Sequence, residues 1–523
     1  MGKHLLVGCA FLCILFSSPY AQAQEIEVIE VVGSNVEVSE PDPVVDFSIL
    51  NQLMPQSIYV PGGFGGFLGF TDRGTQTIHT TVYRNGVPAN DAGSGWYDFG
   101  HDVVTGNERL VAISGPNGVL YGSGSLGGTV FINDVLKTGS VYRLGEQHAL
   151  LSNTYANDKH GVNFSYFKVN NGSVKTSNDE TDWYENTTVR SVHNFEHLVV
   201  STNFTDYSYD YDDCFTNAWE LSHDCTQRGN KFGISARNEN VTLGYNRNKT
   251  RFYTGIEQTW ESVAERYYLD SRKDFSLTEN ISTVAGFTAT RETYADSSRN
   301  DYAAYGLLNY KTNTSIGIRV TEDTAVYRLG YERSRISFSV GSSYRNPTLY
   351  ELLGDSFVNS NSNLDPEKST GYEVSYDQWT AFYYDFSQGI DYDFIANQFN
   401  NTGQYTSKGL RYSKDFASLS VLLGYTDSDI ARVPKHSARI SYHWQVHNYT
   451  ARVTYTGMFE RGIDTVGTKI DDISTFDVIV STVYRSRYTV SFTIKDALNR
   501  HFEVIPGYGA GGRKMFLTIS SNI

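Results

Sequence analysis

The sequence predicts an all-β transmembrane barrel of about 22 antiparallel strands, with an N-terminal α+β plug domain inside its lumen. Three observations lead to this prediction. Tyrosine supplies 38 of the 523 residues, alternating polar and apolar segments follow one another from residue 139 onward, and a segment of different composition precedes them. Aromatic and β-branched residues favour strands, and Tyr also gathers where strands cross a membrane–water interface.

The overall composition excludes several other classes of protein. A net charge of −15 and a pI near 5.3 argue against a nucleic-acid-binding chain, which would carry a basic patch. An aromatic content of 14% argues against disorder, and 4 cysteines are too few for a disulfide scaffold. A mean hydropathy of −0.38 and a single long apolar run, at the N-terminus, argue against a helical membrane protein.

Alternation with period two defines the strands of the predicted barrel. In one segment the apolar residues share a single parity: Ala438, Ile440, Tyr442, Trp444 and Val446. A water-soluble sandwich would alternate in the same way, but its strands average ~5–6 residues. These segments run nearer ~9–11 residues, the length that a tilted strand needs to cross a bilayer. We expect outward-facing tyrosines to form interfacial girdles; examples are Tyr442, Tyr449, Tyr455, Tyr484 and Tyr488.

The predicted barrel has to be closed and filled. An open sheet edge in lipid would leave backbone N–H and C=O groups without partners, so the first and last strands are expected to pair. The inward parity is polar, which implies a wet lumen. A barrel of this size would be an open pore unless something filled it. The N-terminal domain, rich in Gly, Val, Pro and Asn, is the expected filler.

The first 23 residues have the layout of a secretory signal peptide: Lys3, an apolar run over 5–16, and a small-x-small site at Ala21–Ala23. Removal of this segment leaves two cysteines, Cys214 and Cys225. In an oxidising compartment we expect them to form one disulfide that closes a loop.

Two groups of motifs resemble those of the TonB-dependent outer-membrane receptors. The plug signature comprises Arg73-Gly74, Val82–Asp91, Asn107–Leu110 and Gly115–Gly128, and the barrel motifs are Tyr344–Glu351 and Asn363–Glu367. The resemblance implies a 22-stranded barrel in the outer membrane of a Gram-negative bacterium, with a plug inside it. It also implies import energised by TonB and its inner-membrane partners. We expect a monomer surrounded by outer-membrane lipid, without a nucleic-acid partner.

The resemblance divides the chain into a signal peptide (1–23), a TonB box and linker (24–40), a plug domain (41–138) and a transmembrane barrel (139–523). The TonB box is expected in an extended, β-branched segment: Glu27, Val28, Ile29, Glu30, Val31 and Val32. Such a segment can add as a strand to the sheet edge of a partner. The alternative is that it forms the first strand of the plug.

Reversible ion pairs are expected to hold the plug in the barrel. The candidates are Arg73 and Arg109 on the plug, with Glu351 and Glu373 on the inner barrel wall. The alternative is that these side chains are solvated in the lumen, where an exposed pair contributes little.

The sequence contains no Gly-x-Ser-x-Gly, His-Glu-x-x-His or P-loop motif, so no catalytic site and no enzyme activity are expected. A ligand would instead meet the glycine-rich and aromatic loops of the plug. The candidate ligand-binding residues are Tyr59, Phe64, Phe67, Asn90, Asp91, Trp96, Tyr97 and Asp98. The alternative is that the aromatic members pack the plug against the barrel.

Within the family, the cobalamin receptors are most similar, through Tyr97–His101 and the block Pro347–Leu352. Cobalamin is therefore the ligand that the sequence favours, with a ferric siderophore as the alternative. A passive porin-like channel is the alternative from another class, but it would lack the plug signature. No cofactor is required. Calcium is a candidate because four carboxylates lie close together in sequence, Asp206, Asp210, Asp212 and Asp213, although acidic surface loops are common.

Overall fold

The computed structural model describes residues 36–39, 66–69, 72–170, 182–218, 220–462, 467–509 and 512–522. The predicted signal peptide and the predicted TonB box lie outside the described residues, and so do Tyr59 and Phe64. The statements below concern the described part of the chain.

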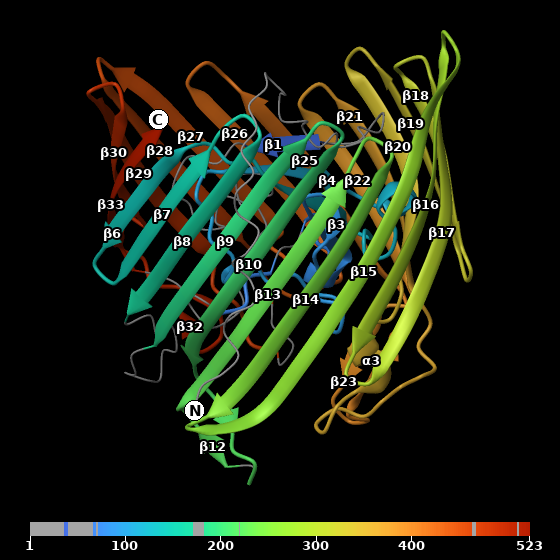
Figure 1. The fold of residues 1–523 in the computed structure, drawn as a ribbon, viewed down its shortest axis with the longest axis horizontal. Helices are drawn as coiled ribbons and strands as arrows, with labels where there is room; N and C mark the ends of the chain where they lie inside the picture. The colour runs from blue at the N-terminus through green and yellow to red at the C-terminus, as the bar shows by residue number, and fades with distance from the viewer. Residues whose placement is uncertain are drawn as a thin grey trace.

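A closed antiparallel barrel of 22 strands forms the wall of the molecule (Figure 1). The chain closes on itself because the last strand pairs with the first, with Ile519 opposite Tyr142. The predicted fold class is therefore confirmed. The strands in chain order are β6 Gly139–Gly145, β7 His148–Ala156, β8 His160–Asn170, β9 Trp183–Phe195, β10 Leu198–Tyr211, β13 Cys225–Arg237, β14 Val241–Thr254, β15 Glu257–Thr278, β16 Ile281–Tyr294, β17 Ser297–Tyr310, β18 Thr314–Thr321, β19 Ala325–Arg333, β20 Ile336–Arg345, β21 Glu367–Tyr376, β22 Trp379–Ser387, β25 Tyr405–Asp415, β26 Leu419–Ser428, β27 His436–Val446, β28 Tyr449–Phe459, β29 Ile473–Tyr484, β30 Tyr488–Lys495 and β33 Lys514–Asn522.

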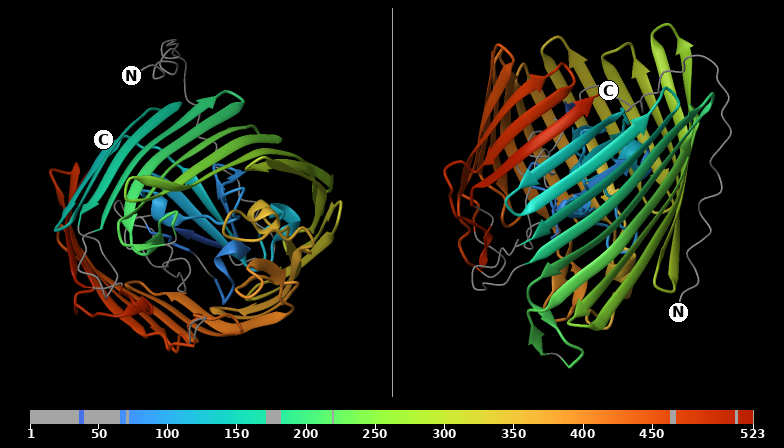
Figure 2. Two further views of the ribbon diagram at one scale, coloured as in Figure 1. Left: turned by 90° about the horizontal axis from the view of Figure 1, so that it is seen from below. Right: turned by 60° about the vertical axis from the view of Figure 1, so that its left-hand side comes forward.

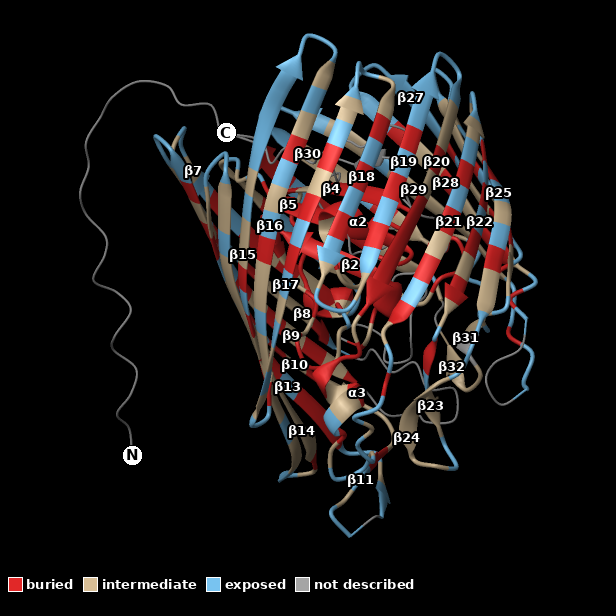
Figure 3. Ribbon diagram, turned by 90° about the vertical axis from the view of Figure 1, so that its right-hand side faces the viewer, coloured by how far each residue is buried: buried red, intermediate tan, exposed pale blue. Residues whose placement is uncertain are grey.

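Burial alternates along the strands as the sequence pattern predicts (Figure 3). In β18 the exposed outer positions are Ile316, Ile318 and Val320, whereas Ser315 and Arg319 are buried on the inner face. Apolar outside and polar inside is the arrangement of a barrel whose outer wall faces lipid. No helix among the described residues is long and apolar enough to cross a membrane.

The tyrosines divide between the two faces of the barrel wall. Tyr442, Tyr449, Tyr484 and Tyr488 are exposed on the outer face, and the partly buried Tyr455 is paired with Ile440 of that face. A second group is buried toward the lumen: Tyr184, Tyr207, Tyr209, Tyr268, Tyr305, Tyr344 and Tyr384. The five tyrosines predicted to face outward do so, and many of the other tyrosines fill the space between plug and wall.

The two rims of the barrel differ in their connections. At the upper rim in Figure 1 consecutive strands are joined by two or three residues, as at 279–280 and 311–313. At the lower rim several connections are longer and carry short elements, namely β11 Cys214–Phe215, β12 Leu221–Ser222, α3 Leu349–Leu353, β23 Ile390–Asp393, β24 Gln398–Asn401, β31 Glu503–Ile505 and β32 Tyr508–Gly509. In outer-membrane barrels short turns face the periplasm and longer loops face outward. The lower rim is therefore the external one.

The plug lies inside the barrel (Figure 2). Its described strands form one five-stranded sheet in the order β1 Val36–Ser39, β4 Glu108–Ser114, β5 Gly128–Asp134, β2 Thr80–Arg84 and β3 Val87–Pro88. The pair β2–β5 is parallel and the other pairs are antiparallel. Three short helices accompany the sheet: η2 Thr77–His79, η3 Phe99–His101 and α2 Gly118–Tyr121.

Local sequence explains how the plug sheet forms. Leu110, Val130 and Ile132 are fully buried at its centre, and they supply the apolar core of the domain. The hairpin between β2 and β3 turns at Asn85 and Gly86, whose φ angles are 49° and 85°. Asn and Gly are the residues that adopt two successive positive φ angles at least cost, so the sequence fixes this turn.

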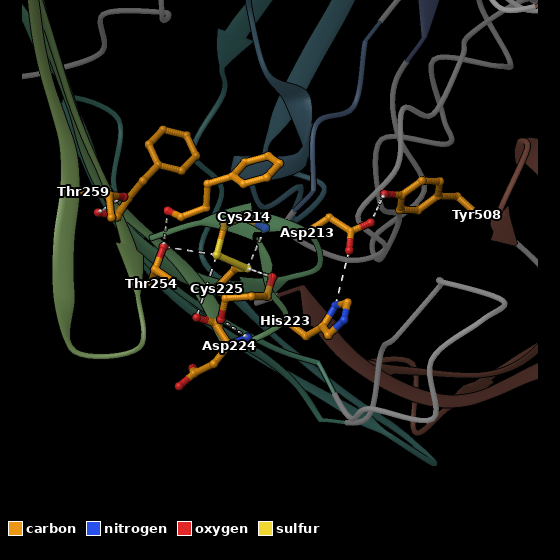
Figure 4. The surroundings of a disulfide bond; sticks show 11 residues. Asp213, Cys214, His223, Asp224, Cys225, Thr254, Thr259 and Tyr508 are labelled. Carbon is orange, nitrogen blue, oxygen red and sulfur yellow. Dashed lines mark hydrogen bonds and ion pairs between the residues drawn. A yellow bond between two sulfur atoms is a disulfide. The ribbon is translucent and has the colours of Figure 1, made fainter. Parts of the chain in front are cut away.

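A disulfide between Cys214 and Cys225 closes the external connection between β10 and β13 (Figure 4). The Cα atoms are 5.8 Å apart, within the usual range for a disulfide. Next to it, the Asp213 carboxylate contacts His223 Nδ1 at 3.3 Å and accepts a hydrogen bond from the Tyr508 hydroxyl at 3.4 Å. The closed loop thereby contacts the connection that carries β31 and β32.

Replacing both cysteines by serine should loosen this loop without opening the barrel. A disulfide that closes a loop of this size stabilises by about 3 kcal/mol, and here the effect stays local because both cysteines belong to one external connection. We expect faster cleavage by chymotrypsin after Phe215 or Leu221, which are 51% and 58% exposed. Resistance of the barrel to denaturation by detergent should be unchanged. Equal cleavage rates for the oxidised wild type and the variant would contradict this expectation.

Candidate ligand-binding site and plug anchors

The plug is tied to the barrel wall through Arg73. Its Nη1 atom lies 2.7 Å from Glu373 Oε1 of β21 and donates to the Tyr384 hydroxyl of β22 at 2.7 Å. Tyr384 in turn donates to Glu373 at 2.6 Å, and the Arg73 and Glu373 side chains are 3% and 6% exposed. The structure thus brings together one of the pairs named from the sequence, in a buried site.

Glu351 has a different partner from the one predicted, and this is a correction. It accepts hydrogen bonds from Arg345 at 2.9 and 3.1 Å, because a capping box with Thr348 at the start of α3 turns the carboxylate toward Arg345. Arg345 also pairs with Glu367, which contacts His79 Nε2 of the plug at 3.2 Å. The two barrel motifs therefore converge on one buried cluster against the plug.

A third buried cluster, which was not foreseen, joins the plug to β9. Arg190 is fully buried; it pairs with Glu108 of the plug and donates to the Val103 carbonyl at 2.7 Å. Beside it, Arg84 bridges Asp134 and Asp102 at 2.9 and 3.2 Å. Glu108 is part of the plug signature, but nothing in the alternation pattern distinguished Arg190 from other inward residues.

The structure gives the position of Arg109, the other plug arginine named from the sequence. It is half-buried on β4, opposite Asn133 of β5. Its pairing with a barrel carboxylate stays a prediction.

A cavity of ≈ 530 Å³ lies between the plug loops and the external end of the barrel wall. This volume falls in the range of small-molecule sites. The plug supplies Phe67, Gln76, Ile78, Ala89, Asp91, Ser94, Trp96, Tyr97, Asp98 and His101, and the barrel and its loops supply Tyr207, Tyr209, Gln227, Lys231, Asn248, Thr250, Phe252, Thr348, Tyr350, Glu351, Ile390, Asp391, Tyr392 and Phe399. Five of the residues predicted to bind ligand line it: Phe67, Asp91, Trp96, Tyr97 and Asp98.

The plug side of the cavity combines an aromatic pair with a fixed carboxylate. The rings of Phe67 and Trp96 are 4.8 Å apart, and Trp96 is 43% exposed, so its ring is available for contact. Asp91 accepts hydrogen bonds from the Gly93 and Ser94 amides at 2.9 and 2.7 Å and from Asn248 at 3.0 Å. These neutral donors hold the carboxylate in place at the edge of the cavity.

Asn90 has a structural position rather than one in this cavity. Its side-chain oxygen accepts from the Val82 amide at 2.7 Å, and its side-chain nitrogen donates to the carbonyls of Thr80 and Gly95 at 3.0 Å. The residue is buried and shapes the loop that carries Asp91. Asn90 lines the smaller space behind this cavity, and its contact with a ligand stays a prediction.

Asp98 and Lys231 meet at the wall of the cavity. Asp98 begins η3, where it accepts from the Gly100 amide at 2.8 Å and from the Leu68 amide at 3.0 Å. Burial raises the pKa of Asp98 to about 6, against the lowering effect of Lys231 and of these amides. The Lys231 ammonium donates to the Asp98 carbonyl at 2.9 Å and lies 5.2 Å from the centre of the Tyr97 ring.

The external loops complete the cavity with further aromatic rings. Tyr350 of α3 and Tyr392 of β23 both pack edge-on against Phe399 of β24, with ring centres 5.9 and 5.3 Å apart. Asp391, between Ile390 and Tyr392, is an exposed carboxylate of the lining. The sequence offered no signal for these residues because they lie in loops that carry no motif.

A smaller space of ≈ 100 Å³ continues inward between plug and wall. It shares Ile78, Asp91 and Thr348 with the cavity, and its lining includes Arg266 and Arg319 of the barrel. The plug therefore blocks the lumen but leaves a polar space directly behind the cavity.

The calcium hypothesis is not supported by the placement of its four carboxylates. Asp206 and Asp210 lie along β10, and Asp212 and Asp213 follow its end. At a rise of ~3.3 Å per residue, Asp206 and Asp212 are about 20 Å apart along the chain, too far to share one ion. No group of three or more His, Cys, Asp or Glu side chains in the described part of the chain is placed to hold a metal ion.

A closed 22-strand barrel with a folded domain in its lumen and a ligand-sized cavity at its external rim defines a plugged outer-membrane receptor. The model of the family "TonB dependent receptor-like, beta-barrel" matches residues 63–497, so the chain belongs to the TonB-dependent receptor family. This is a family of receptors and transporters of the Gram-negative outer membrane and not a family of enzymes.

Three solved structures show the same fold. A variant of the ferric enterobactin receptor PfeA from Pseudomonas aeruginosa, in complex with enterobactin, has a TM-score of 0.71 at 13% identity, over 94% of this chain and 99% of that one. The siderophore receptor PirA from Acinetobacter baumannii has a TM-score of 0.67 at 12% identity, over 93% and 98%. The FrpB iron transporter from Neisseria meningitidis has a TM-score of 0.70 at 10% identity, over 94% and 99%.

Glu373→Gln should weaken the hold of the barrel on the plug. The substitution leaves the Arg73 guanidinium buried without its carboxylate, and breaking a buried pair in this way costs about 3–5 kcal/mol. In planar bilayers we expect the variant to begin conducting ions at a lower urea concentration than the wild type. The control is the double variant Arg73→Met/Glu373→Met, which removes both charges of this pair and should regain part of the resistance. Identical urea profiles for the single variant and the wild type would contradict the proposed anchor.

Proposed function

We propose that this chain imports ferric siderophores across the outer membrane, using energy supplied through TonB. The observation that carries the proposal is the ≈ 530 Å³ aromatic cavity at the external rim, closed on its inner side by the plug. Two of the three similar structures are siderophore receptors, and the third is an iron transporter. Their substrates support the same choice for this chain.

The arrangement suggests how uptake proceeds. A ferric complex reaches the cavity from outside and contacts both the plug loops and the external loops. The buried clusters around Arg73, Glu367 and Arg190 keep the plug seated at rest. Force applied through the N-terminal segment would then disturb these clusters and enlarge the space behind the cavity. We retain the division into 1–23, 24–40, 41–138 and 139–523 as part of this proposal, except that Val36–Ser39 pair with β4 and so belong to the plug sheet.

Cobalamin, which the sequence favours, has less support than the siderophore. The named ligand or cargo of the three reported structures is siderophore or iron. Cobalamin is therefore kept as the competing ligand in the binding test below.

Deletion of Glu25–Gly33 should abolish energised uptake and leave ligand binding intact. The proposed TonB box lies within this segment, whereas the cavity is built from residues far from it in the chain. Uptake of radioactive ferric complexes by cells, and binding to the purified receptor, would be measured in parallel. Ligand binding by the deletion variant is the control, because it shows that the shortened chain still folds. Unchanged uptake after the deletion would refute energised import and favour a passive channel.

Calorimetry of the purified full chain should detect a ferric siderophore and not cyanocobalamin. We expect submicromolar affinity for at least one member of a ferric siderophore panel, and the same affinity with and without Ca²⁺. Trp96→Ala should lower that affinity about tenfold, because it removes the exposed ring of the Phe67–Trp96 pair. Heat of binding with cyanocobalamin alone would reverse the choice of substrate.

A further inference from the structure

The charge of the cavity points to one class of ferric complex. Four carboxylates line it, Asp91, Asp98, Glu351 and Asp391, against the single ammonium of Lys231 among the described lining residues. Glu351 is already balanced by Arg345, which lies behind it. Asp91 accepts hydrogen bonds from the Gly93 and Ser94 amides, the Ser94 hydroxyl and the Asn248 side chain, all of which are neutral donors.

The two basic side chains of the lining already have contacts within the protein. The Lys231 ammonium is fixed between the Asp98 carbonyl and the face of Tyr97. The imidazole of His101 stacks on Tyr207 with ring centres 3.7 Å apart, and its Nδ1 lies 3.2 Å from Asp98 Oδ2. A bound anion would therefore have to compete with these contacts for the Lys231 ammonium or the His101 imidazole of the described lining.

The aromatic rings of the cavity favour positive charge as well. Nine residues of the lining are Phe, Trp or Tyr, and they come from the plug, the barrel wall and the external loops. The face of an aromatic ring attracts a cation, and a neighbouring carboxylate strengthens that attraction when water is excluded. A site with this composition recognises ammonium groups and neutral surfaces better than clustered anions.

Ferric siderophores differ in charge because of their iron ligands. Three hydroxamates neutralise Fe³⁺, and an attached amine then makes the complex cationic, whereas three catecholates leave it with three negative charges. We infer that this receptor selects neutral or cationic trihydroxamate complexes and discriminates against the tris-catecholate trianion. This inference rests on the proposed function and specifies its substrate class.

The test compares three ferric complexes on the purified full-length receptor: ferric desferrioxamine B, which carries one positive charge, neutral ferrichrome, and ferric enterobactin, which carries three negative charges. We expect the cationic or the neutral complex to bind at least about tenfold tighter than the trianion, because the carboxylates of the cavity repel negative charge. Raising the salt concentration should narrow the difference.

Asp391→Lys reverses one charge in an exposed loop position and should shift selectivity without disturbing the fold. We expect affinity for ferric desferrioxamine B to fall roughly three- to tenfold and affinity for ferric enterobactin to rise by at least as much. Asp323→Lys is the matched control: this exposed residue lies in the β18–β19 connection of the same rim, outside the cavity lining. It changes the net charge equally and should leave both affinities unchanged.

The possible results distinguish the inference about ligand charge from the proposed function of siderophore import. Tightest binding of ferric enterobactin by the wild type, or equal shifts in the Asp391→Lys and Asp323→Lys variants, would overturn the charge inference while siderophore import stands. Binding of cyanocobalamin with no heat from any ferric complex would overturn the proposed function itself.

Discussion

The pairing of every backbone polar group inside a lipid bilayer is the constraint on which the rest of this structure depends. It requires the sheet to close, and closure is achieved by the pairing of β33 with β6. A closed barrel of 22 strands encloses a lumen wide enough for a domain. Because the lumen is this wide, polar residues line its wall and the plug domain fills it. The lumen therefore decides where a ligand can bind.

The plug is held in the barrel at defined points of its surface. Its described contacts with the wall include three buried ionic clusters, centred on Arg73, Glu367 and Arg190. Buried ion pairs contribute little net stability, since desolvation offsets their attraction, but they specify one arrangement. These clusters fix the position of the plug together with apolar contacts to the wall, such as those of Val119, Leu120 and Leu126.

The candidate ligand cavity is a composite of segments that are distant in sequence. Asp91 and Trp96 come from the plug signature region, Lys231 from β13, and Tyr350 and Asp391 from two external loops. None of these segments forms the cavity by itself. Together they form an aromatic, predominantly acidic surface on the external side of the plug domain.

The sequence by itself determined the strand period, the plug signature and the Asn85-Gly86 turn, because these depend on local rules of side-chain parity and backbone sterics. It also named Arg73 and Glu373 and five lining residues of the cavity. Only the tertiary structure decided that Glu351 turns to Arg345, that Arg190 holds Glu108, and that four aspartates are spread along and beyond a strand. Such pairings depend on which strands close around the plug, and a one-residue change of register would replace every partner.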